Sequence, residues 1–223
     1  MIENLKPLIL SKRPLIRAYL GDCMDWMQNI PDKYYDLACV DPPYGINFAK
    51  TQTGKGWIIR KNKDWDKNIP SSNYYKELRR VSKNQIIWGA NYMTEHLPPS
   101  MGWIFWDKRQ RDFSLADGEL AFSSFNKALR VYEYSRAKLN QERIGIHPTE
   151  KPVSLYRWLL QNYAKEGQRI LDTHGGSFSS AIACYIEGFD LDICEIDKEY
   201  FDAGVKRFKK DTSQIGIFDD REL

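Results

Sequence analysis

Short apolar runs alternate along this chain with segments whose apolar residues recur at helical spacing, and this alternation constrains the fold more than any other feature. Seven runs are bounded by Gly, Pro or Asp and have the length of buried strands: residues 16–20, 36–40, 85–88, 103–106, 120–123, 169–171 and 191–196. Strands that alternate with helices predict an α/β protein. We therefore expect one seven-stranded, mostly parallel sheet with helices packed on it.

Two helices have clear apolar stripes. One follows Pro152, and the other lies near the C-terminus, where Phe201, Val205 and Phe208 recur at helical spacing. Residues 45–70 and 126–147 have only weak secondary-structure signals, and unstructured loops this long are usually functional or mobile in a compact domain. We expect both stretches to contribute to function rather than to the core.

The length of 223 residues and the 42% hydrophobic content suit a single domain covering residues 1–223. The four cysteines form no C-x-x-C pair and have no histidine at ligand spacing, so we expect reduced core residues and no metal site. No apolar run is long enough to span a bilayer, and the N-terminus lacks the apolar run of a signal peptide. We expect a cytoplasmic protein.

The net charge of +3 is too small to indicate a nucleic-acid partner, but basic residues gather in the two weakly patterned stretches. The candidates for contact with nucleic acid are Lys50, Lys55 and Arg60 in the first stretch and Arg130, Arg136 and Lys138 in the second. A solvated face explains either cluster equally well.

The predicted strand 36–40 runs directly into Asp41-Pro42-Pro43-Tyr44. In open α/β sheets, ligands bind beyond the carboxyl ends of the strands, which is where this tetrapeptide lies. Two consecutive prolines stiffen the segment and lack N–H groups, so the Asp41 carboxylate and the Pro42 carbonyl offer two acceptors for an amino group. Tyr44 adds a flat ring that can stack on a base. A rigid proline turn with a capping Asp is the structural alternative.

A glycine-containing turn follows the predicted strand 169–171. Asp172 leads through Thr173-His174-Gly175-Gly176-Ser177 into a helix that begins near Phe178. Glycines at such a turn let the backbone approach a ligand, and the helix N-terminus favours a carboxylate. Glu195 lies at the end of the next strand, where an acid can hold ribose hydroxyls.

These motifs together resemble the amino-methyltransferases of DNA, whose catalytic motif is D/N/S-P-P-Y/F/W. Three further segments are similar to that family: Gly21-Asp22-Cys23, the H-P-T-x-K-P-like stretch that contains Lys151, and Cys194-Glu195-Ile196-Asp197. The resemblance implies a Rossmann-like fold that binds S-adenosylmethionine. It implies catalysis by Asp41, Pro42, Pro43 and Tyr44, and donor binding by Asp22, Cys23, Lys151, Asp172, Thr173, His174, Gly175, Gly176, Ser177, Glu195, Ile196 and Asp197.

The order of the motifs separates this family from dinucleotide oxidoreductases, which share the glycine turn and the later acid. An oxidoreductase normally opens with its glycine turn, whereas here the tetrapeptide comes first. That order resembles the β class of the family, in which the chain is circularly permuted relative to other methyltransferase folds. The sequence departs from the family pattern at Thr173 and His174, where Pro-Phe is usual, and at Phe178, which replaces a glycine.

The resemblance implies methyl transfer to an exocyclic amino group in double-stranded DNA after base flipping. Asp at position 41 is typical of the adenine-N6 enzymes, whereas cytosine-N4 enzymes mostly carry Ser. The alternatives are a cytosine-N4 enzyme, an RNA amino-methyltransferase, a catalytically weak donor-binding module, and an oxidoreductase, which would leave the tetrapeptide unexplained. Residues 126–147 form a candidate target-recognition region, and their shortness suggests a homodimer or a partner subunit.

Overall fold

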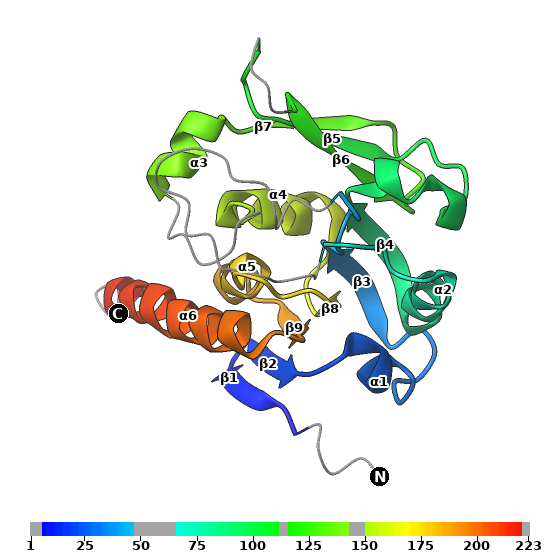
Figure 1. Cartoon of the computed structure of the whole chain (residues 1–223). Helices are drawn as coiled ribbons and strands as arrows, with labels where there is room; N and C mark the ends of the chain where they lie inside the picture. The colour runs from blue at the N-terminus through cyan, green and yellow to red at the C-terminus, as the bar shows by residue number, and fades with distance from the viewer. Residues whose placement is uncertain (1–5, 47–65, 112–115, 143–149, 220–223) are drawn as a thin grey trace.

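The computed structural model describes residues 6–46, 66–111, 116–142 and 150–219, and these build one mixed sheet of nine strands (Figure 1). The strands are β1 (Leu8–Lys12), β2 (Leu15–Leu20), β3 (Tyr35–Val40), β4 (Ser82–Trp88), β5 (Trp103–Asp107), β6 (Gly118–Ser123), β7 (Arg130–Glu133), β8 (Arg169–Asp172) and β9 (Asp190–Glu195). Their order across the sheet is β1-β2-β9-β8-β3-β4-β6-β5-β7.

All seven predicted strands are present, but the predicted number of strands is wrong because β1 and β7 flank the sheet. The prediction counted runs typical of buried strands, whereas both missed strands lie at the edges of the sheet, where their residues are exposed or half-buried. The central pairings β2–β9, β9–β8, β8–β3 and β3–β4 are parallel, as predicted. Antiparallel pairs occur at β1–β2, β4–β6 and β5–β6.

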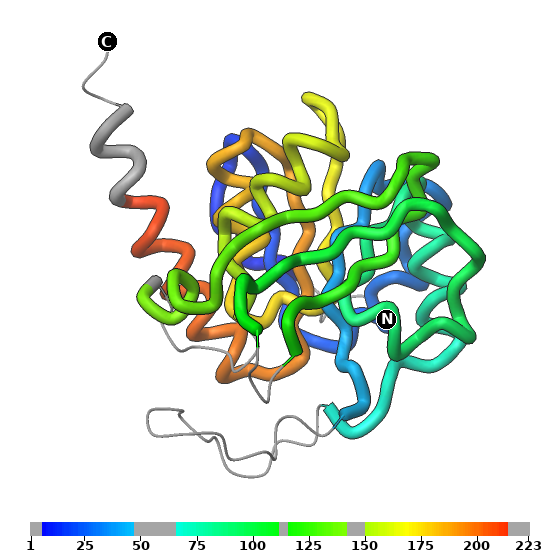
Figure 2. Tube along the Cα trace, turned by 90° about the horizontal axis from the view of Figure 1, so that it is seen from above, coloured from blue at the N-terminus to red at the C-terminus, as the bar shows by residue number. Residues whose placement is uncertain are grey.

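Helices cover both faces of the sheet. The helices α1 (Cys23–Met27) and α2 (Ser72–Val81) pack on one face. The other face carries α3 (Arg136–Glu142), α4 (Val153–Tyr163), α5 (Ser179–Glu187) and α6 (Lys198–Asp219). In Figures 1 and 2, α6 lies on the side of the molecule that carries β9 and β1. No helix in the described ranges is both long and apolar enough to cross a membrane.

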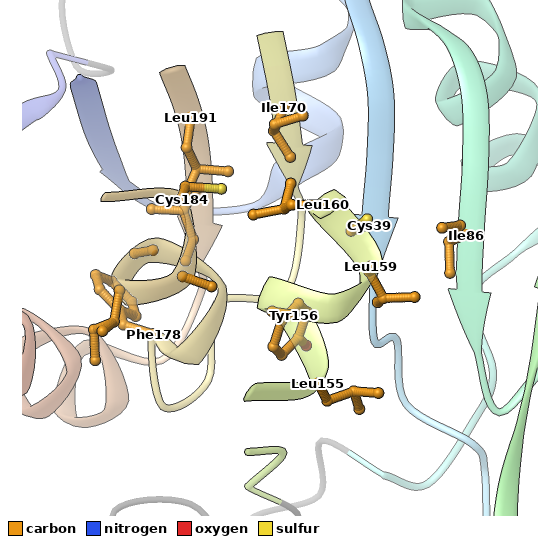
Figure 3. Close-up of a cluster of buried hydrophobic side chains, with 14 of the residues drawn as sticks. Cys39, Ile86, Leu155, Tyr156, Leu159, Leu160, Ile170, Phe178, Cys184 and Leu191 are labelled. Atoms are coloured by element: carbon orange, nitrogen blue, oxygen red, sulfur yellow. The ribbon is translucent and has the colours of Figure 1, made fainter. Parts of the chain in front are cut away.

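Alternate residues of the central strands supply the two cores. Leu37 and Cys39 of β3 point toward α4 and α5, whereas Ala38 and Val40 point toward α1 and α2. Figure 3 shows the first of these cores, in which Leu159 of α4 lies near β3 and β4. The continuous apolar sequence of β3 follows from this double burial.

The two halves of the sheet meet at β3 and β8, which pair in parallel. The crossover connections change direction at this point. From β3 the chain crosses to β4 through α2 on one face, and from β8 it crosses to β9 through α5 on the opposite face. Such a reversal opens a crevice at the carboxyl ends of the two strands, where ligands bind in α/β proteins. Asp41 and Asp172 lie at these two ends.

Residues 126–142 of the second weakly patterned stretch are more ordered than the sequence predicts, and residues 143–147 lie outside the described residues. The described part contains β7 and α3, and it contributes Tyr134 and Leu139 to the buried core. The pattern hides these elements because β7 has only four residues, two of them charged, and α3 is a polar helix with one buried leucine. Residues 47–65 of the other stretch lie outside the described residues.

Candidate functional site

A cavity of about 680 Å³ opens at the crevice between β3 and β8. All four residues of the tetrapeptide line it, together with the glycine turn and Glu195. The ends of β2, β8 and β9 surround one part of the cavity, which we name the donor half. The end of β3 and the strands β5 and β6 surround the other part, which we name the acceptor half.

The tetrapeptide is held at the end of β3 by a carboxylate from a later segment. Asp66 Oδ1 accepts hydrogen bonds from the backbone N–H groups of Tyr44 (2.8 Å) and Gly45 (3.0 Å). These donors follow the two prolines, which have no N–H of their own. Asp66 is buried, so its two bonds fix the turn from inside the protein.

The Asp41 carboxylate is bound on both oxygens. Its Oδ1 accepts a hydrogen bond from the Tyr44 hydroxyl at 2.7 Å, and its Oδ2 lies 2.5 Å from the Lys151 ammonium. Burial raises the pKa of Asp41, and the Lys151 ammonium and the Tyr44 hydroxyl act in the opposite direction. Lys151, predicted as a donor-binding residue, therefore lies against the predicted catalytic carboxylate.

The sequence analysis missed Glu119 and Lys108, which complete the acceptor half. Glu119 on β6 lies 3.2 Å from the ammonium of Lys151 and 2.5 Å from that of Lys108. Although burial opposes the shift, the two lysines lower the pKa of Glu119 to about 2. The predicted strand begins one residue after Glu119, and only the antiparallel pairing of β5 with β6 brings it to the cavity.

The ring of Tyr44 lies against the backbone of Gly89, which follows β4. A Cβ atom at Gly89 would come within 2.1 Å of Tyr44 Cε1, and the φ of +66° at this position also favours glycine. The Tyr44 ring also stacks on Tyr92, with centroids 5.5 Å apart. A glycine at position 89 therefore permits the inward position of Tyr44.

Glu195 organises the donor half. Its carboxylate accepts hydrogen bonds from the backbone N–H groups of Gly176 (2.7 Å) and Asp197 (2.8 Å), which tie the glycine turn to the end of β9. Burial raises its pKa. Asp22, at the end of β2, caps α1 through the N–H of Met24 at 2.8 Å and also lines the cavity.

Most of the predicted donor-binding residues reach the cavity, and two do not. Asp172 and Thr173 lie behind the turn that they support. Asp172 accepts hydrogen bonds from the Ser180 hydroxyl at 2.5 Å and the His174 N–H at 3.0 Å. Burial raises its pKa to about 7. The residues that line the cavity are Asp22, Cys23, Lys151, His174, Gly175, Gly176, Ser177, Glu195, Ile196 and Asp197.

Phe178 does not crowd the cavity. It caps α5 in the left-handed conformation, with φ of 60°, and its ring is fully buried against Phe201 and Gly204. A Cβ at Gly204 would lie 2.4 Å from the Phe178 ring, so the glycine on α6 leaves the space that the ring fills. The phenylalanine that replaces the usual glycine therefore packs in the core.

The residues predicted to contact nucleic acid differ in where they lie. Lys50, Lys55 and Arg60 lie outside the described residues. Arg136 lines the cavity, whereas Arg130 and Lys138 are exposed, the latter with its ammonium 5.0 Å from the Tyr134 ring centroid.

Comparisons with known proteins agree on the type of fold and family. A family model described as DNA methylase matches residues 87–206. The type II methyltransferase M2.MboI of Moraxella bovis is 23% identical over 94% of this chain and 93% of its own length. A structure of the cytosine-N4-specific PvuII DNA methyltransferase matches with a TM-score of 0.60 and 12% identity over 92% of this chain and 90% of that chain. A complex of M1.HpyAVI with SAM matches with a TM-score of 0.56 and 21% identity over 86% of this chain and 99% of that chain.

Proposed function

The chain belongs to the DNA methylase family, and from that premise we propose that it transfers a methyl group from S-adenosylmethionine to the N6 amino group of adenine in double-stranded DNA. The observation that carries the proposal is the position of Asp41, a buried carboxylate at the end of β3 in the same cavity as the glycine turn and Glu195. One cavity thus offers both a hydrogen-bond acceptor for the amino group and a separate half for the donor.

The donor half has the features that S-adenosylmethionine requires. Glu195 uses one lone pair of each oxygen on a backbone N–H, which leaves lone pairs for ribose hydroxyls. The turn at Gly175 and Gly176 carries no side chains, so its backbone can lie close to a ligand. The structure of M1.HpyAVI with SAM shares this fold. These residues fit the donor.

The residues of the acceptor half would orient the amino nitrogen for attack. The bound donor would supply an electrophilic methyl group. The new N–C bond forms as the S–C bond breaks, S-adenosylhomocysteine leaves as the neutral thioether, and the methylated nitrogen releases one proton to water. An exocyclic amino nitrogen is a poor nucleophile because its lone pair is conjugated into the ring. Accepting its hydrogens at Asp41 Oδ1 and the Pro42 carbonyl makes that lone pair more available in the transition state.

Target binding in this proposal includes an exchange at Asp41. The Tyr44 hydroxyl now donates to Oδ1, and the amino group takes its place there. Tyr44 is then available to stack on the flipped base and to offset part of the stacking lost from the duplex. Lys151 remains on Oδ2 throughout and keeps the carboxylate oriented.

The choice of adenine rests on Asp41 itself. A carboxylate makes a charge-assisted hydrogen bond to the amino group, and the resemblance associates Asp with adenine enzymes. Cytosine-N4 methylation is the second candidate, because the PvuII enzyme of that specificity shares the fold. An RNA substrate and a catalytically weak donor-binding role would use the same cavity, and the experiment below distinguishes both from adenine methylation of DNA.

We also propose that residues 1–223 form one domain, circularly permuted relative to other methyltransferase folds, with residues 126–147 as the target-recognition region. The support for the last point is local: Arg136 reaches the cavity, and Arg130 lies exposed on the edge strand β7. Residues 126–147 are a short region for base recognition, which favours a homodimer or a partner subunit.

Plasmid DNA incubated with methyl-labelled donor and this protein tests the proposal. Digestion to nucleosides should give labelled N6-methyladenine, and the Asp41→Ala variant should give none. N4-methylcytosine would overturn the base assignment, and label transferred only to an RNA control would overturn the choice of DNA. Absence of label in all reactions, with donor binding intact, would favour the weak donor-binding role.

A further inference from the structure

His174 is a predicted donor-binding residue at which the sequence departs from the family pattern, because a phenylalanine is usual at its position. Its half-buried ring lines the cavity immediately after β8. The ring packs edge to face against Tyr74 of α2, with centroids 5.5 Å apart and planes at 72°. A phenylalanine could make the same ring contact, so the two ring nitrogens are what distinguishes this chain.

A chain of hydrogen bonds determines which of those nitrogens carries the hydrogen. The Tyr74 hydroxyl lies 2.7 Å from Thr173 Oγ1, which lies 2.9 Å from His174 Nδ1. Tyr74 and Thr173 are buried, and within the described residues Thr173 is the acceptor that the Tyr74 hydroxyl reaches. The Tyr74 hydroxyl must therefore donate to Thr173, whose own hydrogen is then donated to Nδ1.

With Nδ1 as an acceptor, the neutral ring carries its hydrogen on Nε2. Burial lowers the pKa of His174 to about 4, so the ring is neutral at pH 7. Among the hydrogen bonds of the described residues, none involves Nε2. The ring therefore presents an N–H donor at the cavity wall.

We infer that His174 donates a hydrogen bond from Nε2 to the carboxylate in the methionine half of S-adenosylmethionine. The sheet order supports this position, because β8 lies between β9, which carries Glu195 for the ribose, and β3, whose end leads to Asp41 at the transferred methyl group. In the donor, the sulfonium sulfur joins the ribose to the transferred methyl group, and the aminocarboxyl chain branches from that sulfur. The carboxylate is the anionic acceptor at the end of this chain. The inference rests on the proposed function, since it requires S-adenosylmethionine as the ligand.

Calorimetry with two probes tests the inference. S-adenosylhomocysteine contains the carboxylate, whereas 5′-methylthioadenosine has the same nucleoside without it. His174→Phe keeps the ring contact with Tyr74 and removes the donor, so it should weaken S-adenosylhomocysteine binding about tenfold, as expected for one hydrogen bond to a charged group. Its affinity for 5′-methylthioadenosine should stay unchanged.

His96→Phe is the matched control, because His96 also stacks on a tyrosine, Tyr75, at 4.8 Å between centroids but lies outside the cavity. It should leave both affinities unchanged. A Tyr74→Phe variant removes the hydroxyl that fixes the tautomer. Nitrogen NMR of the three histidines should show Nε2–H in His174 of the wild type and a mixture of tautomers in this variant.

Each outcome of the calorimetry bears on either the histidine contact or the proposed function. Equal binding of S-adenosylhomocysteine to the wild type and to His174→Phe would overturn the histidine contact alone. So would equal weakening of both probes, which would place the contact on the nucleoside. If the wild type binds neither probe, the proposed function fails and the histidine contact fails with it.

Discussion

The buried carboxylates around the two halves of the cavity have different kinds of partners. In the donor half, Asp172 and Glu195 accept hydrogen bonds from backbone N–H groups and a serine hydroxyl. In the acceptor half, Asp41 and Glu119 share the Lys151 ammonium. Neutral donors orient a carboxylate without fixing its charge, whereas an ammonium holds the negative charge in place.

This difference corresponds to what each half has to do. The backbone donors of the donor half belong to the turn after β8 and the end of β9, so that surface is formed before a ligand arrives. In the proposed reaction, Asp41 instead exchanges the Tyr44 hydroxyl for an amino group. A fixed positive charge on its second oxygen allows one partner to change without leaving the carboxylate unpaired.

The largest expected effect comes from Asp41→Ala, which should impair the acceptor half and leave the donor half intact. Methyl transfer should fall by about 10²- to 10³-fold or more, the loss typical of removing a preorganised electrostatic contact to the reacting group. Donor affinity should change little, because Asp41 acts on the acceptor nitrogen. Single-turnover transfer and calorimetry measure the two quantities. A variant that still transfers methyl groups at the wild-type rate would show that Asp41 does not hold the amino group.

Glu195→Ala tests the donor half, and its expected effect is on donor affinity. Loss of the carboxylate removes the proposed ribose contact and also releases the Gly176 N–H, so donor affinity should fall by roughly 10- to 100-fold. Glu195→Gln keeps one acceptor oxygen, and its affinity should lie between those of Glu195→Ala and the wild type. Unchanged affinity in Glu195→Ala would remove this residue from the site.

Lys151→Met should change the pH dependence of transfer more than donor affinity. Burial and the nearby Glu119 raise the pKa of Asp41, and without the Lys151 ammonium the Tyr44 hydroxyl is the main contact that opposes them. Loss of the ammonium should therefore raise the pKa of Asp41 further. The rate should rise with pH over a range displaced upward from that of the wild type. An unshifted profile would mean that Lys151 does not keep Asp41 ionised.

The sequence predicts the donor half better than the acceptor half, for a structural reason. Glu195 and the glycine turn each follow a predicted central strand, and parallel strand ends meet at one edge of a sheet, so their proximity follows from the pattern. Glu119 lies on β6 and Lys108 directly follows β5, and a sequence does not specify the antiparallel pairing and register of these two strands. The edge strands β1 and β7 were missed because the prediction counted runs typical of buried strands, whereas every residue of these two strands is exposed or half-buried.

Individual side chains at the turn show the same limit. The strand end at Asp172 was predicted, but the side chain faces Ser180 behind the turn rather than the cavity. Phe178 replaces a glycine of the family pattern, and only the packing of α6 shows that Gly204 leaves room for its ring. Sequence patterns place a residue at a strand end, whereas the packing of distant helices decides which way its side chain points.

The smallest expected effect is on stability, and it uses Asp172 to test how the donor half balances its carboxylates. Burial raises the pKa of Asp172 to about 7 in the folded protein, whereas an unfolded aspartate titrates near 3.9. Between these values the folded state keeps a proton that the unfolded state has lost, so the contribution of Asp172 to stability falls as the pH rises from about 4 to about 7. Asp172→Asn keeps an oxygen for the His174 N–H and does not titrate in this range. Its melting temperature relative to the wild type should therefore rise between pH 5 and pH 8, by about 2 to 4 °C for each kcal/mol of the wild type's loss. A difference that stays constant over this range would mean that the hydroxyl and backbone donors alone keep Asp172 ionised.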